Sequence, residues 1–152
     1  MFRQVLVPVD FGVCSVRAVH HACDLVRAIG GSLTLLHVLE DVEDTSPDGE
    51  AARRAESRLR TLAGRSRRPA HVVVEPGHGR PVAQVILAVA ARLRAELLVL
   101  GPHGQADPDS RQLGRVTRDL LLEARLPVQV VPGRWPLPGP PGARWRMLAG
   151  EG

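Results

Sequence analysis

Apolar residues follow two alternating patterns along the chain. Short continuous apolar runs recur, and between them apolar residues return every three or four positions. A continuous run is typical of a strand buried on both faces, whereas the wider spacing is typical of a helix with one buried face. The runs predict strands at 5–9, 32–39, 70–76, 97–100 and 127–131, and the spacing predicts helices at 15–29, 49–63, 82–93 and 113–124.

Residues at the borders of these segments support the assignment. Ser15 is a suitable N-cap for the first predicted helix, and Gly30 can end it. Pro81 opens the third helix, where its missing N–H costs nothing. Pro8 lies inside the first apolar run and indicates that the outer end of that strand leaves the hydrogen-bonded ladder.

The alternation of strands with helices predicts the fold class. Parallel neighbours require crossover connections, so we expect an α/β protein with three layers, a five-stranded parallel sheet between helices on both faces. The 152 residues suit one domain. We assign this domain to residues 1–132 and expect residues 133–152, which are rich in proline and glycine, to form a C-terminal tail.

The charge of the chain comes from arginine. All 20 basic residues are arginine and the formal net charge is +4. The densest basic region, 53–68, coincides with a predicted amphipathic helix and contains no aromatic residue for stacking on bases. This region is therefore typical of a solvated helix face. Nucleic-acid binding is a third functional hypothesis, behind the two given below.

The sequence gives no support for several other classes of protein. The first apolar run is too short for a signal peptide and no later run could span a membrane, so we expect a cytoplasmic protein without membrane association. Cys14 and Cys23 lie nine positions apart, which on one helix would place them on opposite faces, so they cannot pair within it. The six histidines lack metal-site spacing, and none has a neighbour that suggests nucleophilic catalysis. We predict no metal ligand and no catalytic residue.

Two polar segments follow buried strands and could share a site. Asp10 follows the first strand, and the segment from Gly101 to Gly104 follows the fourth. Ligands of open parallel sheets bind beyond the carboxyl ends of the strands, where the strand order reverses. If the first and fourth strands are neighbours, Asp10 and the glycine segment face one crevice, although the residues alone leave the strand order open.

The glycine spacing resembles a known nucleotide signature. Gly101 and Gly104 are separated by two residues, and Gly104 and Gly114 by nine, as in the universal stress protein family. VLVPVDFGVCSVRA near the start and LPVQVVP near the end are similar to the first and last strands of that family, so the resemblance covers residues 2–132. The resemblance implies the sheet order 3-2-1-4-5. It also implies that ATP, with or without Mg, binds above strands one and four, and that the protein is a homodimer.

The resemblance also implies a set of contact residues. Val9 and Asp10 would contact the adenosine, Val38 the adenine, Gly101 and Gly104 the ribose or phosphates, and Gly114, Arg115 and Val116 the phosphates. Arg115 departs from the signature, which has Ser or Thr at this position. Its guanidinium could pair with a phosphate while the backbone N–H stays available, or its side chain could fill the phosphate space.

These observations define the functional hypotheses. The leading one is a universal stress protein that binds ATP and acts as a stress-response regulator with an unknown protein partner and at most slow ATP hydrolysis. The alternative is a nucleotide-free dimeric interaction protein of the same fold. The residues proposed to contact the nucleotide also have structural explanations. Glycines mark turns and close packing, Asp10 could cap a helix, and Val9 and Val38 could be core residues.

Overall fold

The computed structural model describes residues 3–40, 46, 48–105 and 110–134. Strands and helices alternate along this part of the chain. The five strands are β1 (Gln4–Pro8), β2 (Ser32–Leu39), β3 (Ala70–Pro76), β4 (Leu97–Leu100) and β5 (Val128–Val130). The four helices are α1 (Val13–Ile29), α2 (Glu50–Ala63), α3 (Val82–Arg92) and α4 (Arg115–Glu123).

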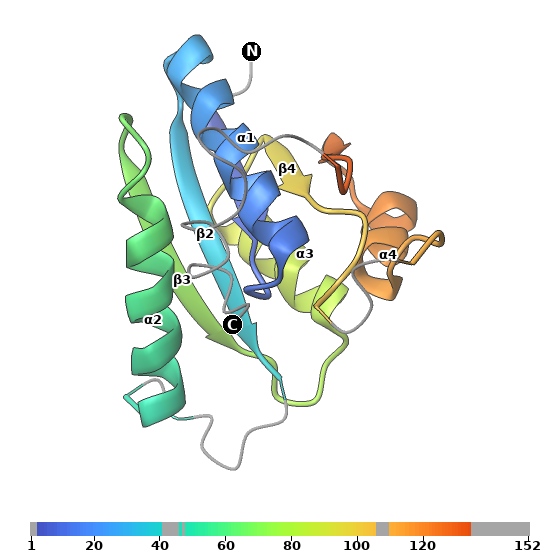
Figure 1. Cartoon of the computed structure of the whole chain (residues 1–152). Helices are drawn as coiled ribbons and strands as arrows, with labels where there is room; N and C mark the ends of the chain where they lie inside the picture. The colour runs from blue at the N-terminus through green and yellow to red at the C-terminus, as the bar shows by residue number, and fades with distance from the viewer. Residues whose placement is uncertain (1–2, 41–45, 47, 106–109, 135–152) are drawn as a thin grey trace.

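The strands form one parallel sheet in the order β3-β2-β1-β4-β5. Helices α1 and α2 cover one face, and α3 and α4 cover the other (Figure 1). The predicted fold class and strand order are confirmed. Residues 135–152, most of the predicted tail, lie outside the described residues.

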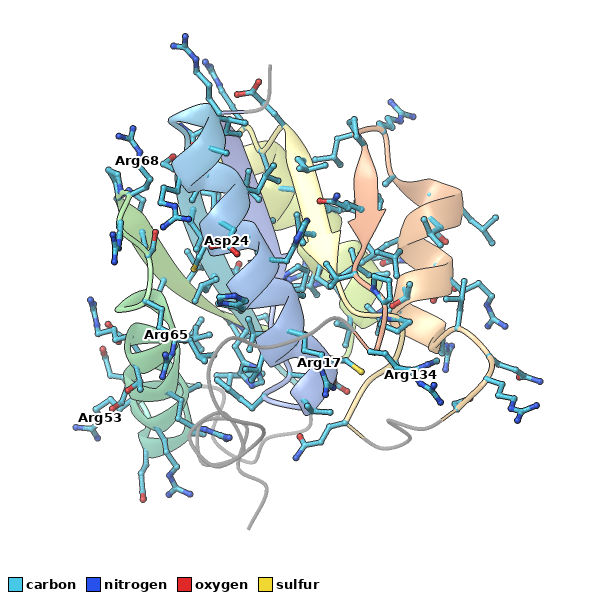
Figure 2. The ribbon with its side chains drawn as sticks, turned by 45° about the horizontal axis from the view of Figure 1, so that its top comes forward. Arg17, Asp24, Arg53, Arg65, Arg68 and Arg134 are labelled. Atoms are coloured by element: carbon cyan, nitrogen blue, oxygen red, sulfur yellow. The ribbon has the colours of Figure 1, made fainter. Side chains whose placement is uncertain are left out.

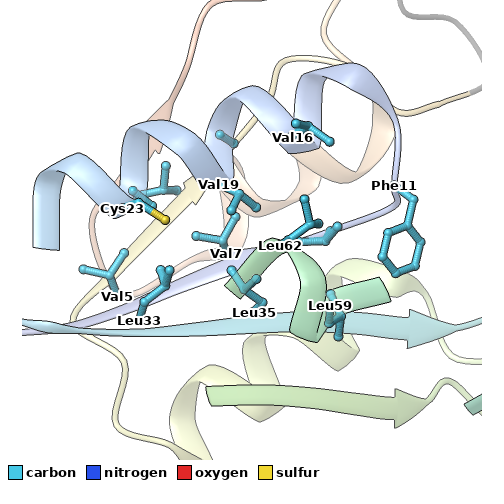
Figure 3. Close-up of a cluster of buried hydrophobic side chains, with 14 of the residues drawn as sticks. Val5, Val7, Phe11, Val16, Val19, Cys23, Leu33, Leu35, Leu59 and Leu62 are labelled. Carbon is cyan, nitrogen blue, oxygen red and sulfur yellow. The ribbon is translucent and has the colours of Figure 1, made fainter. Parts of the chain in front are cut away.

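The core on the α1 and α2 face is built from strand side chains and two helix stripes (Figure 3). Helix α1 buries its side chains at three- to four-residue spacing, and α2 buries Ala52, Ala55, Leu59 and Leu62. Both leucines of α2 are at most 1% exposed. Burial of such a side chain contributes about 1.5–3 kcal/mol, so these stripes hold the helices on the sheet.

The second core lies on the α3 and α4 face. Helix α3 contributes Val85, Ile86 and Val89, and α4 contributes Leu120. Strand β4 is buried at all four of its positions because helices cover both of its faces. Within the described ranges, no helix is long and apolar enough to cross a membrane.

Two predicted helix starts are wrong. Helix α1 begins at Val13 with Gly12 as its N-cap, so Ser15 lies inside the first turn. Helix α4 begins at Arg115 with Gly114 as its N-cap, and Leu113 precedes it with 47% of its surface exposed. For α4 the apolar spacing extends past the helix start, whereas for α1 the predicted start lies two residues inside the helix; in both cases a glycine with extended backbone makes the cap.

Candidate functional site

The predicted crevice corresponds to the place where β1 and β4 separate. Their pairing covers only Val5 with Leu97 and Leu6 with Leu98. The Val9 N–H donates toward β2, to the Leu36 carbonyl at 2.7 Å, so the position before it faces β4. That position is Pro8, which has no N–H to donate. The expected departure from the ladder therefore occurs on the β4 side, at the point where the strand order reverses, whereas Pro8 stays paired with Leu36 of β2.

Asp10 joins the segments on the two sides of this opening. Its Oδ1 accepts the Gly12 N–H at 2.8 Å and the Ser15 hydroxyl at 2.5 Å. Its Oδ2 accepts the Gln105 N–H at 2.7 Å. The Asp10 N–H donates in turn to Ser15 Oγ at 3.0 Å. A single carboxylate thus connects the end of β1, the start of α1 and the segment after β4.

The glycines of the signature lie in close internal contacts. A Cβ on Gly101 would come within 2.7 Å of Cys14 Cβ, so α1 and the end of β4 approach each other through this glycine. A Cβ on Gly104 would come within 3.3 Å of Asp10 Oδ2. A Cβ on Gly114 would lie 3.3 Å from His103 Cα and 3.4 Å from the Gly104 nitrogen. Close packing is therefore one reason why glycine occupies all three positions.

The N-terminus of α4 meets the same segment. Gly114 donates its N–H to the Pro102 carbonyl at 2.8 Å, and Thr117 donates its hydroxyl to the Gly101 carbonyl at 2.8 Å. The first hydrogen bond along the helix runs from the Arg118 N–H to the Gly114 carbonyl. The N–H groups of residues 115–117 therefore have no acceptor within the helix.

No side chain caps these N–H groups, and the first turn of α4 contains no acidic residue. The same holds for α1, which begins beside Asp10 with Gly12 as its N-cap. Two helix N-termini with their partial positive charges thus lie at one edge of the sheet. Uncapped backbone N–H groups at a helix start form a site suited to an anion such as a phosphate.

Arg115 points away from this site. Its side chain is 83% exposed, and its Nε lies 4.0 Å from Asp119 Oδ2, one turn further along α4. Val116 is half-buried and packs against the core on the α3 and α4 face.

Val9 and Val38 are core residues. Val9 is 4% exposed on the α1 and α2 face, and Val38 is 7% exposed on the opposite face. Val38 lies near the carboxyl end of β2, where its Cγ1 is 3.6 Å from a Cβ built on Gly77. Both side chains thus belong to the hydrophobic cores and expose little surface.

A contact between two aromatic rings joins the turn after β1 to β2. Phe11 has a φ of 66° and lies buried against the His37 ring, with the ring centroids 4.7 Å apart. The Arg58 guanidinium of α2 lies 4.0 Å from the centroid of the Phe11 ring. His37 Nδ1 donates to the Val9 carbonyl at 2.7 Å, and burial lowers the pKa of this histidine. The neutral imidazole therefore helps to hold the turn after β1.

Four arginines of segment 53–68 make contacts that hold them on the molecule. Arg54 and Arg60 pair with Glu50 and Glu56, Arg58 stacks on Phe11, and Arg68 donates to the carbonyls of Gly30 and Gly31. Figure 2 shows Arg53, Arg65 and Arg68 along the α2 side of the molecule and Arg17 and Asp24 on α1. These contacts fit the expected amphipathic helix face and do not favour nucleic-acid binding.

Both cysteine thiols are buried. Cys14 and Cys23 form no disulfide. Burial raises the pKa of the Cys23 thiol to about 11, which keeps it protonated at neutral pH. In the part of the chain that the structure covers, no group of three or more His, Cys, Asp or Glu side chains could hold a metal ion.

Three residues of the crevice were missed by the sequence analysis. Ser15 anchors Asp10, Thr117 anchors Gly101, and Gln105 binds Asp10 through its backbone N–H. A hydroxyl three residues after an N-cap glycine is a signal that could have indicated Ser15 and Thr117. Gln105 had no such signal, because its side chain takes no part in the contact.

The comparisons with known proteins agree with this fold. The sequence model of the universal stress protein family matches residues 1–132. No curated protein sequence matches the chain. Among solved structures, universal stress protein UspA from Lactobacillus plantarum is similar with a TM-score of 0.70 and 24% identity, over 86% of this chain and 97% of that one.

Two similar structures contain adenine nucleotides. A universal stress protein from Archaeoglobus fulgidus in complex with dAMP has a TM-score of 0.65 and 19% identity, over 85% of this chain and 97% of that chain. A universal stress protein in complex with cAMP has a TM-score of 0.63 and 21% identity, over 87% and 98%. At these identities the likeness establishes the fold.

Proposed function

The chain belongs to the universal stress protein family, and from this premise we propose that it binds adenine nucleotides, with ATP as the physiological ligand, in the crevice between β1 and β4. In this role it is a cytoplasmic stress-response regulator that acts as a homodimer through a protein partner. Nucleotide binding by the similar dAMP and cAMP complexes supports the ligand class.

The N-terminus of α4 is the observation that carries the proposal. Its uncapped N–H groups at Arg115, Val116 and Thr117 have no acidic neighbour in the first turn. They lie beside the glycine segment, as the close approach of Gly114 to Gly104 requires. A phosphate placed there would receive backbone hydrogen bonds and the positive end of the helix dipole, both stronger for a charged acceptor.

The remaining residues complete the proposed site. Asp10 and Val9 border the nucleoside on the β1 side, Val38 lies on the β2 side, and Gly101 and Gly104 let the backbone approach the ribose and phosphates. Asp10 also sets the position of the glycine segment through the Gln105 N–H. Oδ1 already accepts two hydrogen bonds, whereas Oδ2 accepts this one from the described residues and has a further lone pair, so the structural role is compatible with a ligand contact through Oδ2.

Calorimetric titration of nucleotide-free protein with ATP, ADP and AMP tests the proposal. We expect measurable heat with ATP, and we expect Gly114→Val to weaken ATP binding by about tenfold or more because its side chain would displace the glycine segment from the α4 N–H groups. Gly64→Val, at the end of α2 and far from the crevice along the sheet, is the control and should leave the affinity unchanged.

Thermal melts of both variants show whether each remains folded. Absence of heat and of any thermal shift with all three nucleotides at millimolar concentration would contradict the proposed function and favour the nucleotide-free interaction protein.

A further inference from the structure

Arg115 combines two groups that can bind phosphate at different places. Its backbone N–H belongs to the first turn of α4, and its guanidinium is at the end of a long flexible side chain. The Cα–Cβ bonds of a helix tilt toward its N-terminus, so a side chain at the first helical position can extend beyond the helix start. The two donors of this one residue are therefore separated by the length of the side chain.

The guanidinium is held only weakly in its present position. Its Nε is 4.0 Å from Asp119 Oδ2, and the arginine and aspartate side chains are 83% and 30% exposed. An exposed pair at this distance contributes little free energy. A phosphate can compete for the guanidinium, whose planar donors match phosphate oxygens in pairs.

Charged groups near the helix start favour this exchange. The first turn of α4 has no acidic residue that would hold the guanidinium. The Asp10 carboxylate, which follows β1, already accepts hydrogen bonds from Gly12, Ser15 and Gln105. Asp119, one turn along the helix, is thus the carboxylate with which a phosphate would compete for the Arg115 guanidinium.

We propose that Arg115 makes the site selective for the number of phosphates on the nucleotide. A single phosphate engages the backbone N–H groups of the helix start, whereas a diphosphate or triphosphate also reaches the guanidinium after it leaves Asp119. The chain accordingly binds ATP and ADP more tightly than AMP. This inference rests on the proposed function and adds to it the residue that discriminates among adenine nucleotides.

Titrations with AMP, ADP and ATP in a buffer containing EDTA test the inference, since no divalent cation then shields the phosphates. We expect Arg115→Gln to weaken ATP and ADP binding by about tenfold and to leave AMP binding unchanged. Asp119→Asn, which releases the guanidinium, should increase the preference for ATP over AMP. Arg118→Gln is the matched control, because it removes an equal charge from an exposed position of the same helix.

The possible outcomes distinguish a failure of the proposed Arg115 selectivity from a failure of the proposed nucleotide binding. Binding of all three nucleotides with equal affinity to the unmodified protein, or equal losses in Arg115→Gln and Arg118→Gln, would overturn the selector role and leave nucleotide binding intact. Failure of every nucleotide to bind would overturn the proposed function itself. Circular dichroism of each variant confirms that the helix persists, since all three substitutions are on exposed or half-exposed positions of α4.

Discussion

At the scale of single residues, the main result is that Asp10 has a structural task. The sequence left two roles open for this residue, a helix or turn contact and a ligand contact. The structure shows the first directly, because both carboxylate oxygens accept hydrogen bonds from the chain. Loss of nucleotide binding in an Asp10 variant would therefore not identify a direct contact, whereas Arg115, whose side chain is 83% exposed, can be changed without disturbing the packing of the site.

His37 yields a prediction about pH. Burial lowers its pKa from the ordinary value of 6.5, so the folded protein takes up a proton at this site less readily than the unfolded chain. The unfolded state then binds more protons below about pH 6.5, and the free energy of unfolding falls as the pH decreases toward the lowered pKa. His20, whose pKa burial also lowers, acts in the same direction.

Urea unfolding at about pH 7.5 and about pH 5.5 measures this effect. The unmodified protein should be less stable at the lower pH, and His37→Gln should reduce the difference between the two values. His71→Gln, on an exposed position of β3, is the control and should leave the difference as it is. An unchanged difference in the His37 variant would show that its protonation does not limit acid stability.

At the scale of elements, the separation of β1 from β4 determines where a ligand can enter. Pro8 withholds an N–H from β4, and the glycine segment begins directly after the last β4 residue. The same place requires α1 to approach β4 closely, which Gly101 permits because a Cβ there would lie 2.7 Å from Cys14 Cβ. The crevice and the packing of α1 thus depend on the same glycine.

Gly101→Ala tests this dependence. The added methyl group has no space beside Cys14, so α1 or the end of β4 must shift, at a cost of about 1–3 kcal/mol in the free energy of unfolding. Gly64→Ala is the control: its φ of −60° and ψ of −10° suit any residue, and its Cβ would meet only ordinary contacts at 3.5 Å. Equal stability of both variants in urea would show that Gly101 is not constrained by packing.

At the scale of the whole molecule, the sequence predicted the architecture well because strands buried on both faces and helices buried on one face have different periods. The strand order came from the family resemblance, since the pattern of apolar residues is compatible with more than one order. The helix starts were harder to predict, because Gly12 and Gly114 cap through backbone conformation and leave no polar side chain as a signal.

The site was predicted less completely than the fold. The sequence predicted that Asp10 and the glycine segment face each other if the first and fourth strands are neighbours. In the structure these strands are neighbours, and Asp10 accepts a hydrogen bond from the Gln105 N–H, directly after Gly104. The sequence could not predict that the Gln105 backbone makes this contact, or that Arg115 turns toward Asp119, because both depend on backbone and rotamer geometry. The predicted dimer and the tail beyond residue 134 stay predictions.

The most direct test of the central claim is to record the backbone amide NMR spectrum of the nucleotide-free protein during addition of ATP. Every non-proline residue has an amide signal, so the spectrum reports the position of the ligand residue by residue. We predict the largest shifts at Arg115, Val116 and Thr117, together with Gly104 and Gln105. Shifts confined to other parts of the chain, or none at millimolar ATP, would contradict a nucleotide site at the start of α4.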